Sequence, residues 1–459
     1  MLRNILKLFS ASAAGQALAF LLLPLIARIY TEEEMGLTGL FLSVTGLLTL
    51  FAGGRYEFSI LLEGRQRLTA FRLTTLINVA FSLLLWLILA LYGHEIWTFL
   101  RYEALIPYTH YIPAIVFLAA LGFAMTYLFN SCRQFSASAT YNFGQIALNN
   151  LLKLLPLLGI GGGALMLILS NLLSYLLALP LFFVSSKENI KRLYALATRN
   201  PLRKATPPLS QESGHWQENT PHCEAQESRL PGETDRSSDG GEEKLRTIAH
   251  RHRRFPLYAL PQAGINYFAG NAVIFILSIP FGMAEIGLYT MAVMLGTRPL
   301  SLLCGALEQV LAQDLASKRT QGKSMVPIVL RFCRHTFLYG LPAFALLYWL
   351  IPILLDWYLP AKWADTATYL RLLLPLLFMM LLVAPASCIP SVVNAQRGAL
   401  IIEVGILLGR VAFLWIGMQG GNFAHALLVY SIGTAFLLAI QYLWFLHLLR
   451  KDRRACTLQ

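Results

Sequence analysis

Apolar segments of about 20 residues, the length of a membrane span, recur along this whole chain of 459 residues. A helix of that length rises about 30 Å, which matches the hydrocarbon core of a lipid bilayer. The chain is 56% hydrophobic and only 13% charged, and a soluble domain of this size would need more polar surface to cover its core. We therefore expect an all-α polytopic membrane protein.

The apolar segments predict about twelve transmembrane helices, in two pseudo-symmetric lobes of six around a central cavity. Their expected bounds are 7–29, 35–54, 73–93, 109–130, 139–160, 163–185, 257–281, 285–313, 328–355, 366–390, 399–418 and 422–449.

The segment between the two sets of spans is polar and rich in Ser, Glu, Pro and Gln. Such a composition buries too little apolar area to offset the entropy of ordering the chain. We expect residues 1–186 to form the first lobe, 187–255 a largely disordered cytoplasmic linker, 256–449 the second lobe and 450–459 a cytoplasmic tail.

The basic residues predict the orientation of the spans. Of the 37 Lys and Arg, five lie inside spans and only Arg101 and Lys362 fall in loops on the side opposite the termini. Cytoplasmic loops carry the excess of Lys and Arg in membrane proteins. We therefore expect both termini in the cytoplasm, and we attribute the net charge of +13 to topology rather than to nucleic-acid binding.

The two lobes share a short motif. Glu34-Met35-Gly36-Leu37 recurs 251 positions later as Glu285-Ile286-Gly287-Leu288, and the same offset relates Glu57 to Glu308. Because each lobe has an even number of spans, the copies have the same orientation and are related by an axis along the membrane normal. Transporters built from such repeats bind their substrate near mid-membrane, at the interface of the repeats.

Five cations lie inside predicted spans, and few acids lie at comparable depth. Each such charge costs about 2.5–3.5 kcal/mol on insertion scales, and it usually faces a water-filled cavity, a partner or a substrate. This excess of positive charge predicts a pathway for an anionic substrate. The five cations are Arg28, Lys153, Arg298, Arg371 and Arg410.

The fifth span carries a strip of polar side chains: Asn142, Gln145, Asn149 and Lys153. Their spacing of three or four residues places them on one face of a helix. Amides donate and accept hydrogen bonds, so this strip suits hydrated sugars and phosphates. The alternative is contact between helices, because polar side chains also join spans to each other.

The later spans add further candidates for substrate binding. Gln262 and Asn266 share one face of the seventh span, where substrate contact and helix–helix contact are equally open. Arg298 offers a planar fork that matches phosphate oxygens, unless it forms a structural ion pair. Arg410 lies near the middle of its span, whereas Arg28 and Arg371 lie closer to the outer face and can extend towards it.

Three acids lie towards the cytoplasmic ends of their spans: Glu57, Glu308 and Glu403. They are candidates for proton or cation coupling, or they pair with loop residues such as Arg55. The sequence has no nucleotide-binding loop of the form GxxxxGK[ST]. Loops on the outer side are too short for a catalytic domain, so we expect no enzyme activity. No pair of the six cysteines has the spacing of metal ligands, so we expect no metal, and we expect no cofactor.

Short motifs in both halves point to a family. They are Gly15-Gln16, Arg28-Ile29-Tyr30, Glu33-Glu34-Met35-Gly36, Arg55-Tyr56-Glu57, Arg254-Phe255-Pro256, Phe281-Gly282, Glu285-Ile286-Gly287-Leu288-Tyr289, Arg298-Pro299 and Gln309-Val310. Together they resemble the polysaccharide transporter (O-antigen flippase) family, which belongs to the multidrug/oligosaccharidyl-lipid/polysaccharide (MOP) exporter superfamily.

The resemblance implies two six-helix lobes around a V-shaped cavity in the bacterial inner membrane. It implies a substrate of oligosaccharide repeat units on undecaprenyl diphosphate, for O-antigen or another surface polysaccharide, and other polysaccharide assembly proteins as partners. The cavity cations of such flippases would correspond here to Lys153, Arg298 and Arg410. The long linker departs from the short linker that is usual in the family.

Four other functions are possible for a chain with these spans. A lipid II flippase is closely similar, but it is expected to have extra C-terminal spans. A multidrug or cation antiporter of the same superfamily should carry unpaired acids in mid-cavity. A membrane-embedded glycan polymerase or ligase would need a large outer loop with paired carboxylates, and a scaffolding protein would not explain the buried cations.

Overall fold

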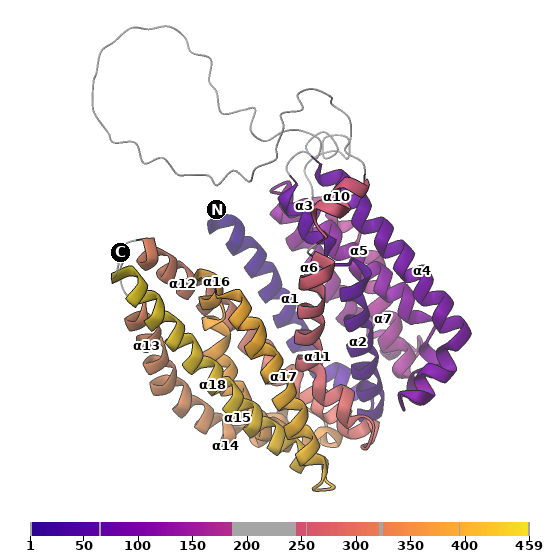
Figure 1. Cartoon of the computed structure of the whole chain (residues 1–459). Helices are drawn as coiled ribbons and strands as arrows, with labels where there is room; N and C mark the ends of the chain where they lie inside the picture. Colours follow the sequence, from indigo (N-terminus) through magenta and orange to yellow (C-terminus); the bar gives the residue numbers. More distant parts are fainter. Residues whose placement is uncertain are drawn as a thin grey trace, which may run out of the picture.

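The computed structural model describes residues 2–63, 66–185, 245–253, 255–320, 325–393 and 395–457. These residues form helices joined by short turns, with no strand among them (Figure 1). Twelve long helices correspond to the twelve expected spans, so the all-α fold is confirmed. They are α1 (Leu2–Ile29), α2 (Glu32–Ala52), α4 (Arg67–Phe99), α5 (Tyr111–Ser131), α6 (Phe135–Leu152), α7 (Gly163–Ala178), α11 (Leu260–Leu277), α12 (Met283–Thr320), α14 (Leu341–Tyr358), α15 (Asp365–Ala386), α17 (Gln396–Met418) and α18 (Phe423–Thr457).

Short elements connect these helices. They are η1 (Tyr56–Phe58), α3 (Ser59–Leu62), η2 (Glu103–Tyr108), η3 (Leu155–Leu158), α8 (Leu181–Ser185), α10 (Leu245–Arg251), η5 (Phe255–Ala259), α13 (Val326–His335), η6 (Thr336–Gly340), η7 (Ala361–Trp363) and α16 (Ile389–Val392). Ten of the described helical stretches are long and apolar enough to cross a membrane. In α1 the apolar stretch is shorter, Ala13–Ile29, and α6 is more polar because it carries the amide strip.

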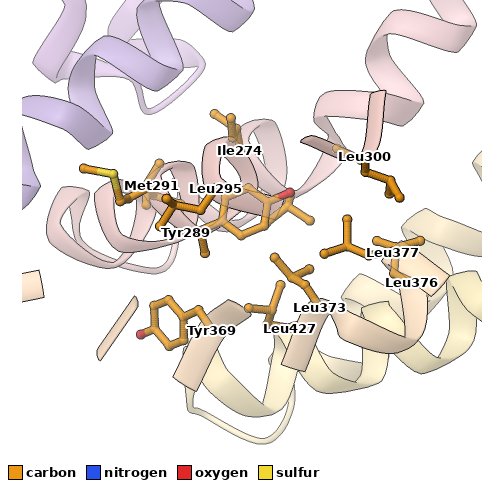
Figure 2. Close-up of a cluster of buried hydrophobic side chains, with 14 of the residues drawn as sticks. Ile274, Tyr289, Met291, Leu295, Leu300, Tyr369, Leu373, Leu376, Leu377 and Leu427 are labelled. Atoms are coloured by element: carbon orange, nitrogen blue, oxygen red, sulfur yellow. The ribbon is translucent and has the colours of Figure 1, made fainter. Parts of the chain in front are cut away.

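We call helices α1–α8 the first half and helices α11–α18 the second half. The two halves lie apart at the end that carries both termini and converge at the opposite end (Figure 1). In the second half, α12 packs against α15 and α15 against α18, and large apolar side chains such as Leu295, Leu373 and Leu427 form a common cluster (Figure 2). Lipid tails are as apolar as these side chains, so close packing rather than hydrophobic burial holds such helices together.

The repeated motif lies at the point of convergence, where α2 crosses α12. A Cβ atom added to Gly36 would lie 1.9 Å from the carbonyl oxygen of Met283, and one added to Gly287 would lie 1.8 Å from that of Glu32. The two equivalent glycines therefore let the two helix backbones touch, each at the corresponding place in its repeat. The motif also starts α2, because the backbone N–H of Glu34 donates to Thr31 Oγ1 and the N–H of Thr31 donates to Glu34 Oε2.

A second contact closes the same end. Trp363 is fully buried and its indole N–H donates to the carbonyl of Ala27 over 2.8 Å. The ammonium of the neighbouring Lys362 donates to the carbonyl of Tyr30 over 2.6 Å. Both acceptors lie at the C-terminal end of α1, where unpaired carbonyls favour a cation. The loop between α14 and α15 thus holds the end of the first helix of the other half.

We expect Trp363→Phe to weaken this contact while keeping an aromatic ring in place. The substitution leaves the buried Ala27 carbonyl without its donor, which costs about 1–3 kcal/mol. A lower midpoint of thermal unfolding of the purified protein would show the loss. Trp357→Phe is the matched control because Trp357 is 85% exposed, and equal stability of both variants would contradict a structural role for the indole bond.

The part of the expected linker at 187–244 lies outside the described residues. Its last part forms α10, which packs on the first half: Ile248 is fully buried beside Ile60 and Leu73. Arg251 Nη1 donates to Glu63 Oε1 over 3.0 Å, and His252 Nε2 lies 2.8 Å from the same oxygen. The chain therefore contacts the first half again before it enters α11. At the other end, α18 continues through the expected tail as far as Thr457.

Candidate functional site

A polar cavity of about 400 Å³ lies where α1, α6 and α7 of the first half face α12 of the second. The structure brings four of the predicted site residues together in its lining: Gln145, Asn149, Lys153 and Arg298. The cavity volume is within the usual range for small-molecule pockets. Its position between the halves is the place where repeat-built transporters bind their substrates.

Helix α6 supplies three of these residues from one face. Gln145 Nε2 donates to Ser174 Oγ over 3.4 Å, which joins α6 to α7. Asn149 Oδ1 is buried and has no hydrogen-bond partner. Lys153 follows the last residue of α6, and its backbone carbonyl accepts a bond of 2.9 Å from the hydroxyl of Tyr30. This bond fixes the end of α6 against the end of α1.

Arg298 supplies the cation of the second half. Its Nη1 atom is buried without a hydrogen-bond partner, and no carboxylate of the described residues lies within ion-pair distance of it. A structural ion pair within the described part of the chain is therefore not its role. Arg298 and Lys153 are close enough for their charges to act on each other. No carboxylate lines the cavity, so its field is positive.

Sequence reasoning missed other polar residues of the lining. Gln16 enters from α1, Asn171 from α7, and Thr297 and Ser301 flank Arg298 on α12. Asn171 Oδ1, like Asn149 Oδ1, is buried without a partner. A single amide within an apolar span gives no clear signal, because it is equally typical of helix–helix contacts.

Three predicted amide positions lie outside this lining. Asn142 is half-buried on α6, about two helical turns before Asn149. Gln262 Nε2 donates to Glu403 Oε2 over 3.3 Å, which joins α11 to α17. Asn266 is exposed on α11. For Gln262 the structure therefore shows the helix–helix contact that the sequence left open.

Three predicted cations also lie elsewhere. Arg410 Nη1 donates to the carbonyl of Ala269 on α11 over 2.9 Å, and its Nε atom is buried without a partner. Arg28 is exposed at the edge of an apolar groove of about 750 Å³ between α1, α12, α14 and α15. Arg371 Nε donates to the carbonyl of Tyr348 over 2.8 Å. The structure does not bring these three cations into the polar cavity.

None of the three predicted coupling acids lines the cavity. Glu57 is buried in η1, and its Oε1 atom lies 3.5 Å from Arg55 Nη1. Burial raises the pKa of the Glu57 carboxyl, and the charge of Arg55 partly opposes this rise. Glu308 is exposed on α12 and accepts a bond from Ser387. Glu403 is the acceptor for Gln262.

Known proteins share this fold across nearly the whole chain. An inward-facing multidrug resistance MATE family transporter of the MOP superfamily has a TM-score of 0.67 and 15% identity, with 98% of this chain and 95% of that chain covered. The lipid II flippase MurJ in an inward closed conformation has a TM-score of 0.68 and 11% identity, with 100% and 90% covered.

A MOP superfamily transporter from Pyrococcus furiosus, with a binding pocket of reverse polarity, has a TM-score of 0.59 and 14% identity, with 99% and 96% covered. Residues 246–368 match the model of a polysaccharide biosynthesis protein family. No curated protein sequence matches the chain. The chain therefore has the fold of MOP superfamily transporters, with two six-helix lobes, and its residues 246–368 resemble a polysaccharide biosynthesis protein family.

Proposed function

We propose that this MOP-type transporter is a flippase for oligosaccharide repeat units linked to undecaprenyl diphosphate, such as those of O-antigen. It would move them from the cytoplasmic to the periplasmic leaflet of the bacterial inner membrane, with no catalytic step and no cofactor. The polar cavity carries the proposal, because it combines two cations, Lys153 and Arg298, with amides and has no carboxylate in its lining.

The cavity chemistry suits a diphosphate that carries a sugar. A phosphate oxygen about 4 Å from a guanidinium gains about 4 kcal/mol at an effective dielectric of 20. The unpaired Arg298 Nη1 atom is a free donor for such an oxygen. The unpaired Asn149 Oδ1 and Asn171 Oδ1 atoms are free acceptors for sugar hydroxyls. A ligand with phosphate and hydroxyl groups would pair all three atoms.

The lipid part of the substrate needs an apolar path. Helix α12 separates the polar cavity, lined by Arg298, from the apolar groove, lined by Leu295 and Pro299. A polyprenyl chain could therefore lie in this groove or in the surrounding membrane while its head group occupies the cavity. Arg28, at the edge of the groove, would meet the diphosphate on its way out.

Transport would proceed by alternating access. The halves converge at the end opposite the termini (Figure 1), so this end must open before the head group can leave. The membrane potential, negative inside, would push an anion outward by about 2.3 kcal/mol per charge per 100 mV. If Glu57, Glu308 or Glu403 couples an ion to this cycle, it does so outside the cavity lining.

The cavity disfavours a drug or cation exporter, which would need a carboxylate where this chain has Arg298 and Lys153. A lipid II flippase shares the diphosphate of its substrate, so the cavity alone does not separate it from the proposed function. A strain that lacks this protein does separate them. In this strain we expect undecaprenyl-linked oligosaccharide to accumulate on the cytoplasmic leaflet, and we expect cell-wall synthesis to stay normal. Accumulation of lipid II, or of neither lipid, would overturn the proposed substrate.

We expect Asn149→Leu to lower transport up to about tenfold, because it removes a hydrogen bond to the sugar that is worth about 0.5–1.5 kcal/mol. Asn142→Leu should have a smaller effect, since Asn142 lies on the same helix but outside the cavity lining. The amount of surface polysaccharide at equal protein level measures both. Equal losses in the two variants would contradict sugar binding in this cavity.

A further inference from the structure

Arg371 lies in a second groove, of about 690 Å³, between α14, α15 and α18. The lining is otherwise uncharged and mostly apolar, with Ala345, Trp349 and Phe378 among its members. No residue of the first half lines it. The groove is therefore separate from the polar cavity and opens to the outside of the second half, where the membrane surrounds the protein.

The guanidinium of Arg371 is held in a fixed position. Its Nε atom donates to the carbonyl of Tyr348 over 2.8 Å, and its Cζ atom lies 4.9 Å from the centre of the Tyr348 ring. Among the residues that the structure describes, no carboxylate forms an ion pair with it, and no protein acceptor is found for Nη1 or Nη2. The outer edge of the fork is free for a ligand.

The charge lies inside the helical stretch Ala361–Ala386, which is long and apolar enough to cross a membrane. Arg371 follows the start of α15 at Asp365 by six residues, which is about 9 Å along the helix axis. The side chain does not extend back to the surface, because its Nε atom is bonded to Tyr348 on α14. A membrane charge at such depth is costly without a partner, so an anionic partner from the membrane would stabilise it.

We propose that Arg371 and this groove bind a phospholipid in the half of the membrane opposite the termini. The phosphate would pair with Nη1 and Nη2, since a guanidinium fork matches phosphate oxygens. One acyl chain would lie along the groove over Ala345 and Phe378. Tyr348 and Trp349, which are 45% and 73% exposed, would contact the same lipid from α14. The bound lipid would join α14 to α15 within the second half.

The amides that would bind sugars in the polar cavity are lacking in this groove. A phospholipid, which has a phosphate and two chains but no oligosaccharide, therefore fits it better than the transported lipid does. This inference is independent of the proposed function, because it depends only on the second half and on ordinary membrane lipid.

Native mass spectrometry of the full-length protein in mild detergent can test the site. With phosphatidylglycerol added, we expect one lipid to be retained by the wild-type protein at collision energies that remove the others. Arg371→Gln should lower this retention at least tenfold, and Arg371→Lys should lower it less. Arg101→Gln is the matched control, because Arg101 is exposed in a loop on the same side of the membrane.

Two further measurements separate the phosphate contact from the groove. Ala345→Trp keeps Arg371 but fills the groove, so it should also lower retention. Diacylglycerol with the same chains but no phosphate should be retained at least tenfold less than phosphatidylglycerol. Equal retention of the two lipids, or undiminished retention by folded Arg371→Gln protein, would overturn the proposal. If Arg371→Gln abolished a dimer of the protein rather than a bound lipid, Arg371 would contact a second copy of the chain. That result would also overturn the proposal.

Discussion

In cells that carry Arg298→Ala in place of the wild-type protein, the rate of transport of lipid-linked oligosaccharide should fall about 100- to 1,000-fold. The guanidinium is the cation of the second half in the polar cavity, and no described carboxylate pairs with it. Its contact with a phosphate is worth about 4 kcal/mol at an effective dielectric of 20, and each 1.4 kcal/mol is a factor of ten. The remaining charge of Lys153 should prevent a complete loss.

Arg298→Lys should lose only about tenfold, because it keeps the charge but not the planar fork. Surface polysaccharide at equal protein level, and transport into vesicles, would measure both variants. Arg331→Ala is the control, since Arg331 is exposed on α13, away from the cavity. Undiminished polysaccharide in the Arg298→Ala strain would contradict the docking of a phosphate on this cation.

The sequence predicts most of the fold, because a membrane span is encoded locally. Each helix must satisfy its own backbone within the bilayer, so length and hydropathy locate α4 or α14 without knowledge of their neighbours. Position along a span also gives the depth of each charge. The strip of Gln145, Asn149 and Lys153 could be found in this way, because their spacing of four residues places all three side chains on the same face of the helix.

What the sequence does not encode locally is the neighbour of a helix face. Arg410 and Arg298 both lie near the middle of apolar spans, but Arg410 meets a carbonyl of α11 whereas Arg298 lines the cavity. The bond between Gln262 and Glu403 likewise joins residues 141 positions apart. For Arg371 the sequence left open both substrate binding and extension towards the outer face, and the structure bonds its Nε atom to a backbone carbonyl of α14. These outcomes depend on the packing of distant helices, which hydropathy and spacing do not report.

The repeated motif shows how a local pattern can carry such information. The sequence identified Gly36 and Gly287 as equivalent positions, and equivalent positions of a two-fold arrangement meet if they lie near its axis. The structure shows that they do meet, through backbone contact between α2 and α12. Glycine at both positions is thus explained by the approach of the two helices, at the end that would open in the proposed transport cycle.

Gly36→Ala should shift the protein away from the conformation in which this end is closed. The added Cβ would lie 1.9 Å from the carbonyl oxygen of Met283, and backbone atoms cannot move aside without separating the helices. Forcing a methyl group into close packing costs about 1–3 kcal/mol, which changes the ratio of closed to open protein by about 5- to 150-fold. Gly287→Ala should act in the same direction through the carbonyl of Glu32.

Labelling of a cysteine in the cavity measures this ratio. With Ser301→Cys in a chain that lacks its own cysteines, a membrane-impermeant maleimide should react faster from the side opposite the termini when Gly36→Ala is present. Gly405→Ala is the matched control, because a Cβ added at Gly405 meets no atom within 4 Å. If Gly36→Ala and Gly405→Ala gave the same labelling rates, the glycine contact would not hold this end closed. The need for glycine would then arise from helix packing alone.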